Sequence, residues 1–332
     1  MPFPDRGALV ISLDFELYWG MRDCQTVENY GANIRGVHQL IPRLLELFER
    51  RRIHATWATV GLLTFRNRAE LRSHLDIVRP NYENPGLCPY RYIEETLTRE
   101  DASSDPLHFG ADLVELIAQT PGQELGSHTF SHYYTLESHI DSAALAADLE
   151  ASRAALSPWT DQVRSIVFPR NQYDDTVLDV AKDAGLTIYR GNENHWAYWP
   201  KAWSEQTRAQ RLFRLLDTYV NLSGHHLEDW PRPSANGTVN VPASRFLRPY
   251  NARLAAFDPL KLRRITRGLE SAASEKKIYH LWWHPHNMGI NISENLQFLD
   301  RILDKFEELS ETHGLISSNM GEIADLVAQT DP

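Results

Sequence analysis

Four short segments of this 332-residue chain carry side chains that could do hydrolytic chemistry. The first is Ser12-Leu13-Asp14-Phe15-Glu16, which ends an apolar run. Because side chains alternate along a strand, Asp14 and Glu16 would project to the same side at the strand's end. Two carboxylates that close repel each other unless a cation or a shared proton lies between them. The pair alone is equally consistent with a solvated strand end.

The second segment, His128-Thr129-Phe130-Ser131-His132, follows a predicted strand at 123–127. If the chain turns into a helix there, the two histidines lie at i and i+4 on one face, as two ligands of one ion require. The chain has 14 His and only 2 Cys, so nitrogen and oxygen atoms would hold any metal. That many histidines also make this spacing common by chance. The carboxylate pair at another strand end favours the metal site.

The third and fourth segments also follow predicted strands. In Phe168-Pro169-Arg170-Asn171-Gln172-Tyr173, Arg170 could pair with a carboxylate or a substrate oxygen, and the backbone N–H of Tyr173 could donate to an oxyanion. Taken in isolation, Arg170 is better explained as a surface arginine in a turn. In the last segment, His280, His284 and His286 share one face of a continued strand. Because His284 lies at the strand's end, it is the predicted general acid.

The elements that must position these residues alternate along the chain. Strands are predicted at 8–13, 55–60, 123–127, 164–168, 186–190 and 278–283, and helices at 37–48, 111–119, 142–155, 174–184, 204–220, 258–273, 294–309 and 320–329. A strand, helix, strand order implies parallel pairing. Seven or eight βα units in one chain favour an α/β barrel over an open sheet. We expect a single domain, 1–332, with Pro- and Gly-rich loop insertions near 79–110 and 191–251.

The composition and charge of the chain limit the classes of partner that the protein could bind. The net charge of −10 excludes nucleic acid as the main partner, because such a surface repels phosphates. No apolar run approaches the length of a membrane span, and the first residues lack a cationic leader. Two cysteines make no disulfide framework. We therefore expect a cytoplasmic protein without a membrane span; the oligomeric state is left open.

In this order the four segments resemble the polysaccharide deacetylase family, the NodB-type carbohydrate esterases. His128-Thr129-Phe130-Ser131-His132 matches the family motif H-[ST]-x-x-H, and Asp14-Phe15-Glu16 resembles its aspartate-rich first motif. Trp282-Trp283-His284 resembles its last motif. The resemblance implies a distorted (β/α) barrel, a divalent metal with zinc as the expected ion, and removal of N-acetyl groups from sugars.

The resemblance also assigns roles. Asp14 becomes the base, His284 the acid and Arg170 the family's arginine, while Glu16, His128 and His132 become the metal ligands. The predicted substrate contacts are Tyr173, Trp196, Trp283 and His286. Arg170 departs from the family pattern, because it follows Pro169 instead of preceding a proline. The aspartates that orient the family's catalytic histidine have no clear match, and the substitutes considered are Arg190, Glu193, Glu228 and Asp229.

The predicted reaction converts an N-acetylated polysaccharide, oligosaccharide or sugar precursor to acetate and a free amino sugar. A cytoplasmic enzyme would meet nucleotide- or lipid-linked sugars before export, which favours a role in surface-polysaccharide or O-antigen assembly. Two alternatives stay open. One is a metal-dependent hydrolase of a non-sugar amide on the same barrel, and the other is a catalytically impaired family member that binds carbohydrate.

Overall fold

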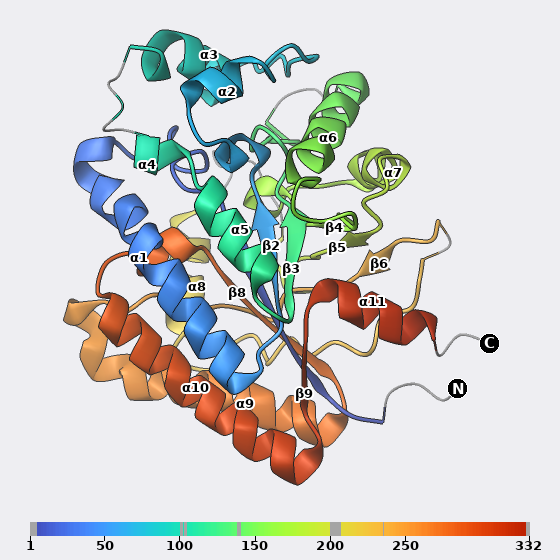
Figure 1. Ribbon diagram of the computed structural model, residues 1–332. Coiled ribbons are helices and arrows are strands. Elements are labelled where there is room, and N and C mark those ends of the chain that lie inside the picture. Colours follow the sequence, from blue (N-terminus) through green and yellow to red (C-terminus); the bar gives the residue numbers. More distant parts are fainter. Residues whose placement is uncertain are drawn as a thin grey trace.

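A curled parallel sheet forms the centre of the protein. The computed structural model describes residues 5–99, 102, 105–137, 141–199, 207–234 and 236–329. The strand order is β6-β5-β4-β3-β2-β1-β8-β7, and β9 pairs with β1 (Figure 1). The strands are β1 (Ala8–Phe15), β2 (Ala55–Thr59), β3 (Gln123–Ser127), β4 (Ser165–Ile166), β5 (Ile188–Tyr189), β6 (Val239–Asn240), β7 (Arg245–Phe246), β8 (Ile278–Trp283) and β9 (Ile316–Ser318).

One short segment joins the two ends of this strand order. Residues 239–246 contain both β6, which pairs with β5, and β7, which pairs with β8. Between them, the backbone N–H of Ala243 donates to Gly191 and that of Ser244 to His280. The sheet therefore curls into the predicted distorted (β/α) barrel. Within the predicted insertion 191–251, this segment is part of the barrel and not a loop laid on it. Its two-residue strands are too short to show a sequence period.

Helices surround the barrel. The longer ones are α1 (Val27–Arg51), α5 (Ala111–Gln119), α6 (Ser142–Leu156), α7 (Asp175–Asp183), α8 (Arg208–Asp217), α9 (Asp258–Glu275), α10 (Ile292–His313) and α11 (Met320–Ala328). Helices α1, α10 and α9 lie side by side along one side of the sheet (Figure 1). Among the described residues, no helix combines the length and apolarity that crossing a bilayer requires.

The stretch 79–110, predicted as a loop, contains short helical pieces instead. They are α3 (Pro89–Tyr92), a π-helical turn (Ile93–Leu97) and α4 (Asp105–His108), preceded by α2 (Arg68–Arg72). Short 3₁₀ turns at Gly61–Thr64, Pro85–Leu87, Pro169–Asn171, Ala252–Phe257 and Pro285–Met288 complete the connections. Residues 204–206 of the predicted helix 204–220 lie outside the described residues, and α8 begins at Arg208.

The barrel interior changes from apolar to polar along β1. Leu9, Ile11 and Leu13 belong to the main apolar core, whereas Val10 belongs to a second cluster that Met320 of α11 also joins. Ser12 and Asp14, on the same face as Val10, are buried among polar groups. The lower layer of the barrel is therefore sealed by apolar side chains, and polar chemistry is confined to the carboxyl ends of the strands, where barrel active sites form.

Candidate active site

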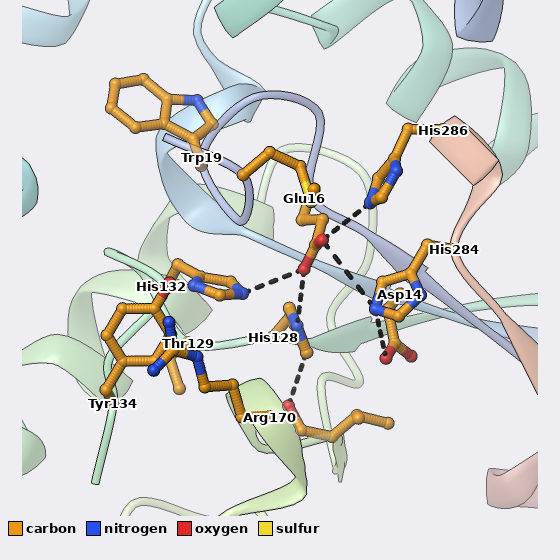
Figure 2. Close-up of polar contacts among 12 residues, drawn as sticks. Asp14, Glu16, Trp19, His128, Thr129, His132, Tyr134, Arg170, His284 and His286 are labelled. Carbon is orange, nitrogen blue, oxygen red and sulfur yellow. Dashed lines mark hydrogen bonds and ion pairs between the residues drawn. The ribbon is translucent and has the colours of Figure 1, made fainter. Parts of the chain in front are cut away.

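Glu16 stands at the centre of a group of histidines, directly after β1 (Figure 2). Its Oε2 lies 2.9 Å from Nε2 of His132 and 3.3 Å from Nε2 of His128. Its Oε1 lies 2.8 Å from Nε2 of His286. Gly20 makes room for this side chain, because a Cβ on Gly20 would lie 2.1 Å from the Glu16 carboxyl carbon. The predicted metal ligands are thus brought together, and Glu16 also meets a histidine that was not predicted to touch it.

His128 and His132 share one side of the site, but not because a helix follows β3. The segment after Ser127 is an irregular loop in which Thr129 and His132 adopt the left-handed region, with φ of 61° and 56°. Asp148 of α6 accepts the backbone N–H groups of Phe130 and Ser131 at 2.7 and 3.2 Å. The helix that would have placed the two histidines on one face therefore does not form. A buried carboxylate from a neighbouring helix, which the sequence analysis missed, holds this loop.

The hydrogen bond of His128 and the pKa of His132 fit a metal site. Nδ1 of His128 lies 2.7 Å from the carbonyl oxygen of Val167, so it carries the proton and leaves a lone pair on Nε2. That lone pair faces a carboxylate oxygen, an arrangement that requires a proton or a cation between the two atoms. Burial lowers the pKa of His132 to about 4, although Glu16 raises it, so His132 is neutral near pH 7. Two imidazole nitrogens and one carboxylate are a typical donor set for zinc.

His286 is held differently, on the turn after β8. Its Nδ1 lies 2.9 Å from the hydroxyl of Tyr30 and 3.2 Å from Nδ2 of Asn287. Because the side-chain amide nitrogen of Asn287 can only donate, we infer that Nδ1 of His286 accepts and that its Nε2–H donates to Glu16. The atoms of Glu16, His284 and His286 are also close enough to share an ion, but this tautomer leaves no lone pair on Nε2 of His286. Buried against Glu16, His286 orients the carboxylate, and its role as a substrate contact stays a prediction.

Asp14 lies beside the predicted metal ligands and forms an ion pair with Arg190, the residue after β5. The guanidinium binds both carboxylate oxygens, at 2.6 and 2.8 Å. Burial raises the pKa of Asp14, but the opposing effects, led by the charge of Arg190, leave it below its ordinary value of 3.8. Nε2 of His284 lies 3.5 Å from Asp14. The predicted base is therefore an ionised carboxylate with the predicted acid next to it.

A chain of hydrogen bonds fixes Arg190 from below. Nδ1 of His280 lies 3.0 Å from the Val241 carbonyl oxygen, and its Nε2 lies 2.8 Å from the Ser12 hydroxyl. Ser12 in turn accepts a hydrogen bond from Arg190 at 3.0 Å. Burial lowers the pKa of His280 to about 3, so its ring is neutral and can accept the Ser12 proton. His280, which shares a strand face with His284, therefore belongs to the support of the base.

Arg170 does not reach Asp14. Its guanidinium pairs with Asp23 and Glu137, the latter at 2.8 Å, and lies 4.0 Å from the ring centre of Tyr134 (Figure 2). The chain turns at Arg170 in the left-handed region, and the next residue, Asn171, accepts a hydrogen bond from Arg190 at 2.7 Å. Arg170 therefore does not contact the predicted base, and its role as a catalytic residue stays a prediction. Arg190 binds Asp14 instead, and sequence reasoning named it only as one of several substitutes.

Of the predicted substrate contacts, Trp283 lies away from the site. Its side chain is completely buried on the outer face of β8, against Phe48 of α1. Trp282, one residue earlier, lies on the site's side: its ring is 4.2 Å from the Arg190 guanidinium and 5.7 Å from the His284 ring. Strand alternation carries this distinction, because Trp282 shares its face with His280 and His284.

The remaining predicted residues lie around the site. The Tyr173 ring packs between Phe168 and Tyr189, and the Trp196 ring contacts Phe213 of α8. Their role in substrate binding stays a prediction. Among the considered substitutes for the orienting aspartates, Glu193 accepts a long hydrogen bond from Trp282, whereas Glu228 pairs with Ile278 at the opposite end of β8. Nδ1 of His284 is buried and has no hydrogen-bond partner within the described part of the chain.

Comparisons with known proteins agree with this fold. The family model "Polysaccharide deacetylase" matches residues 30–189, a region that contains His128 and His132 but neither Asp14 nor Glu16. A structure from Mycobacterium smegmatis assigned to the polysaccharide deacetylases has a TM-score of 0.59 at 11% identity and covers 99% of this chain and 93% of its own. No protein in a search of curated proteins matches.

Two further structures share the fold. One from Pseudomonas aeruginosa PAO1, also assigned to the polysaccharide deacetylases, has a TM-score of 0.53 at 12% identity and covers 100% of this chain and 96% of its own. PuuE allantoinase has a TM-score of 0.58 at 12% identity and covers 99% and 93%. At these identities the likeness concerns the fold alone.

Proposed function

Because residues 30–189 match the polysaccharide deacetylase family model, we propose that this protein is a metal-dependent hydrolase that removes N-acetyl groups from a carbohydrate. The observation that carries the proposal is the juxtaposition of two groups at the mouth of the barrel. One is the ligand set Glu16, His128 and His132, and the other is Asp14, held ionised by Arg190.

The ligand set would hold one divalent ion, with zinc expected, which when bound polarises an amide carbonyl and lowers the pKa of water. Asp14 would accept the proton of the attacking water, for which its ionised state suits it. His284 would protonate the departing sugar nitrogen, and its Nε2, 3.5 Å from a carboxylate oxygen of Asp14, supports the proposal that acid and base serve one reacting centre. Arg190 would keep Asp14 oriented through both oxygens.

The substrate in this proposal is a sugar that carries an acetamido group, and the products are acetate and a free amino sugar. The partly exposed ring of Trp282, beside Arg190 and His284, would be an aromatic contact for the C–H groups of a pyranose. A sugar unit of a surface polysaccharide or its precursor is the substrate class that we propose.

A non-sugar amide is the second candidate, because an allantoinase has the same fold. The test is acetate release from N-acetylglucosamine oligomers, compared with hydrolysis of allantoin by the same zinc- or cobalt-loaded protein. We expect acetate release that Asp14→Asn abolishes without loss of bound metal. Turnover of allantoin alone would support the second candidate. Protein that binds the oligomers without any turnover in either assay would be the impaired, carbohydrate-binding alternative.

A further inference from the structure

Helix α8 buries polar side chains and exposes apolar ones, the reverse of the usual surface helix. Its buried residues are Gln210 and Asp217, whereas Leu212 and Leu216 are 57% and 49% exposed. Asp217 is drawn inward by Arg245, whose Nη1 lies 3.1 Å from its carboxylate. The turn continues beyond the helix, since Val220 N–H donates to Leu216, and Val220 is 54% exposed. Leu212, Leu216 and Val220, each four residues apart, therefore form one apolar stripe that faces away from the protein.

Other apolar side chains extend this stripe. Of the eleven large apolar residues that are exposed in the described chain, eight belong to this region, which we call the α8–α9 patch: Trp196, Trp199, Leu212, Leu216, Val220, Leu222, Phe257 and Leu260. Ring contacts connect its parts, Trp196 with Phe213 of α8 and Tyr219 with Phe257 before α9. Single exposed leucines need no explanation, but a cluster of this kind marks an interaction surface.

The patch lies in a basic part of an acidic protein. Residues 207–267 contain eleven Lys and Arg against four Asp and Glu, a net charge of +7, whereas the whole chain carries −10. Arg263 and Arg267 continue the exposed face of α9 from Leu260 at helical spacing, and Arg208 begins the stripe of α8. These arginines are exposed, and among the described residues none of them forms an ion pair with a carboxylate.

We propose that the α8–α9 patch docks the protein on an anionic phospholipid surface. Leucine and tryptophan side chains that enter the interface, bordered by arginines, are the features of a helix lying in the headgroup region of a bilayer. A second copy of this chain fits less well, because a two-fold axis through the patch would set the arginines of both copies against each other. The connections that carry the patch leave the carboxyl ends of β5 and β7, the end of the barrel that holds Glu16, so docking would bring the site toward the membrane.

The test is co-sedimentation of the full chain with vesicles of phosphatidylglycerol mixed with phosphatidylcholine, and with vesicles of phosphatidylcholine alone. We expect the protein to bind the mixed vesicles about tenfold more tightly than vesicles of phosphatidylcholine alone. Binding to the mixed vesicles should weaken as the salt concentration rises. The double variant Leu212→Asp/Leu216→Asp should lose about tenfold or more of the binding, because both side chains must leave the acyl boundary. Leu116→Asp, at an exposed leucine outside the patch, is the matched control and should bind as the wild type does.

Circular dichroism of each variant shows whether it folds, and Arg263→Glu/Arg267→Glu tests the charge without touching the leucines. This variant should bind the mixed vesicles no better than neutral ones. Wild-type protein that stays in the supernatant with mixed vesicles would overturn the proposal. So would a dimer in light scattering that Leu212→Asp/Leu216→Asp separates while vesicle binding is absent. Neither outcome touches the proposed deacetylation, which is measured on soluble oligomers.

Discussion

Two pairs of histidines meet the same glutamate from opposite sides, and they differ in which nitrogen is free. His128 and His132, after β3, face Oε2 of Glu16, and His128 gives its Nδ1 proton to a backbone carbonyl. His286, after β8, receives hydrogen bonds on Nδ1 and faces Oε1 with an N–H. Residue type and distance therefore do not distinguish a metal ligand from a residue that orients one. For His128 and His286, the partner of the second ring nitrogen does.

The largest effect should follow from a substitution in the first pair, His128 and His132. His128→Ala takes away a lone pair that faces Glu16, so we expect loss of bound zinc and of all turnover. Metal content after dialysis, measured by mass spectrometry, checks this. A His128→Ala protein that keeps one zinc per chain would show that the His284 and His286 side holds the ion. His128 would then be the residue that orients Glu16.

His284 should separate chemistry from binding. If it is the acid, His284→Asn lowers kcat by about 100- to 10,000-fold, because a general acid contributes that much, while the zinc affinity stays unchanged. Substrates with better leaving groups, such as N-acetylated anilines, should recover part of the loss, because their nitrogen needs less help from an acid. Loss of zinc in this variant would contradict the role.

His286 should have an intermediate effect. His286→Ala removes the hydrogen bond to Oε1 of Glu16, and a lost partner of this kind weakens metal binding by about 10- to 100-fold. Zinc titration with a competing chelator measures it. His286→Gln, which can place an amide N–H near Glu16, should recover part of the affinity. If His286→Gln is no better than His286→Ala, the proton on Nε2 is not what matters.

The smallest effect is expected from replacing either arginine with lysine. The pH dependence of the two variants tests which arginine binds Asp14. Burial raises the pKa of Asp14, but the opposing effects, led by the charge of Arg190, leave it below its ordinary value. Arg190→Lys weakens the two-pronged contact, so the pKa of Asp14 rises and the acid limb of kcat/KM moves to higher pH. Arg170→Lys should leave that limb in place. An equal shift in both variants would mean that the limb reports another group.

Several features could be predicted from the sequence because they depend on local pattern. The strand at Ile278–Trp283 was predicted with its full bounds, and the apolar run before Asp14 placed that carboxylate at a strand end. Alternation placed Asp14 and Glu16 on one face. The His128 and His132 pair was also correct as a pair, although the reason was not, because a loop and not a helix holds it.

What the sequence by itself determined is which residue types stand at the ends of the strands, and hence that carboxylates and imidazoles meet at one end of a barrel. Only the tertiary structure decided their partners. Arg190 and not Arg170 binds Asp14, Asp148 holds the loop of His128, and the segment 239–246 closes the sheet. These contacts join residues far apart in the chain, and two-residue strands and single ion pairs leave no period in a sequence. The same holds for α8, whose leucines face outward because Asp217 is paired inside.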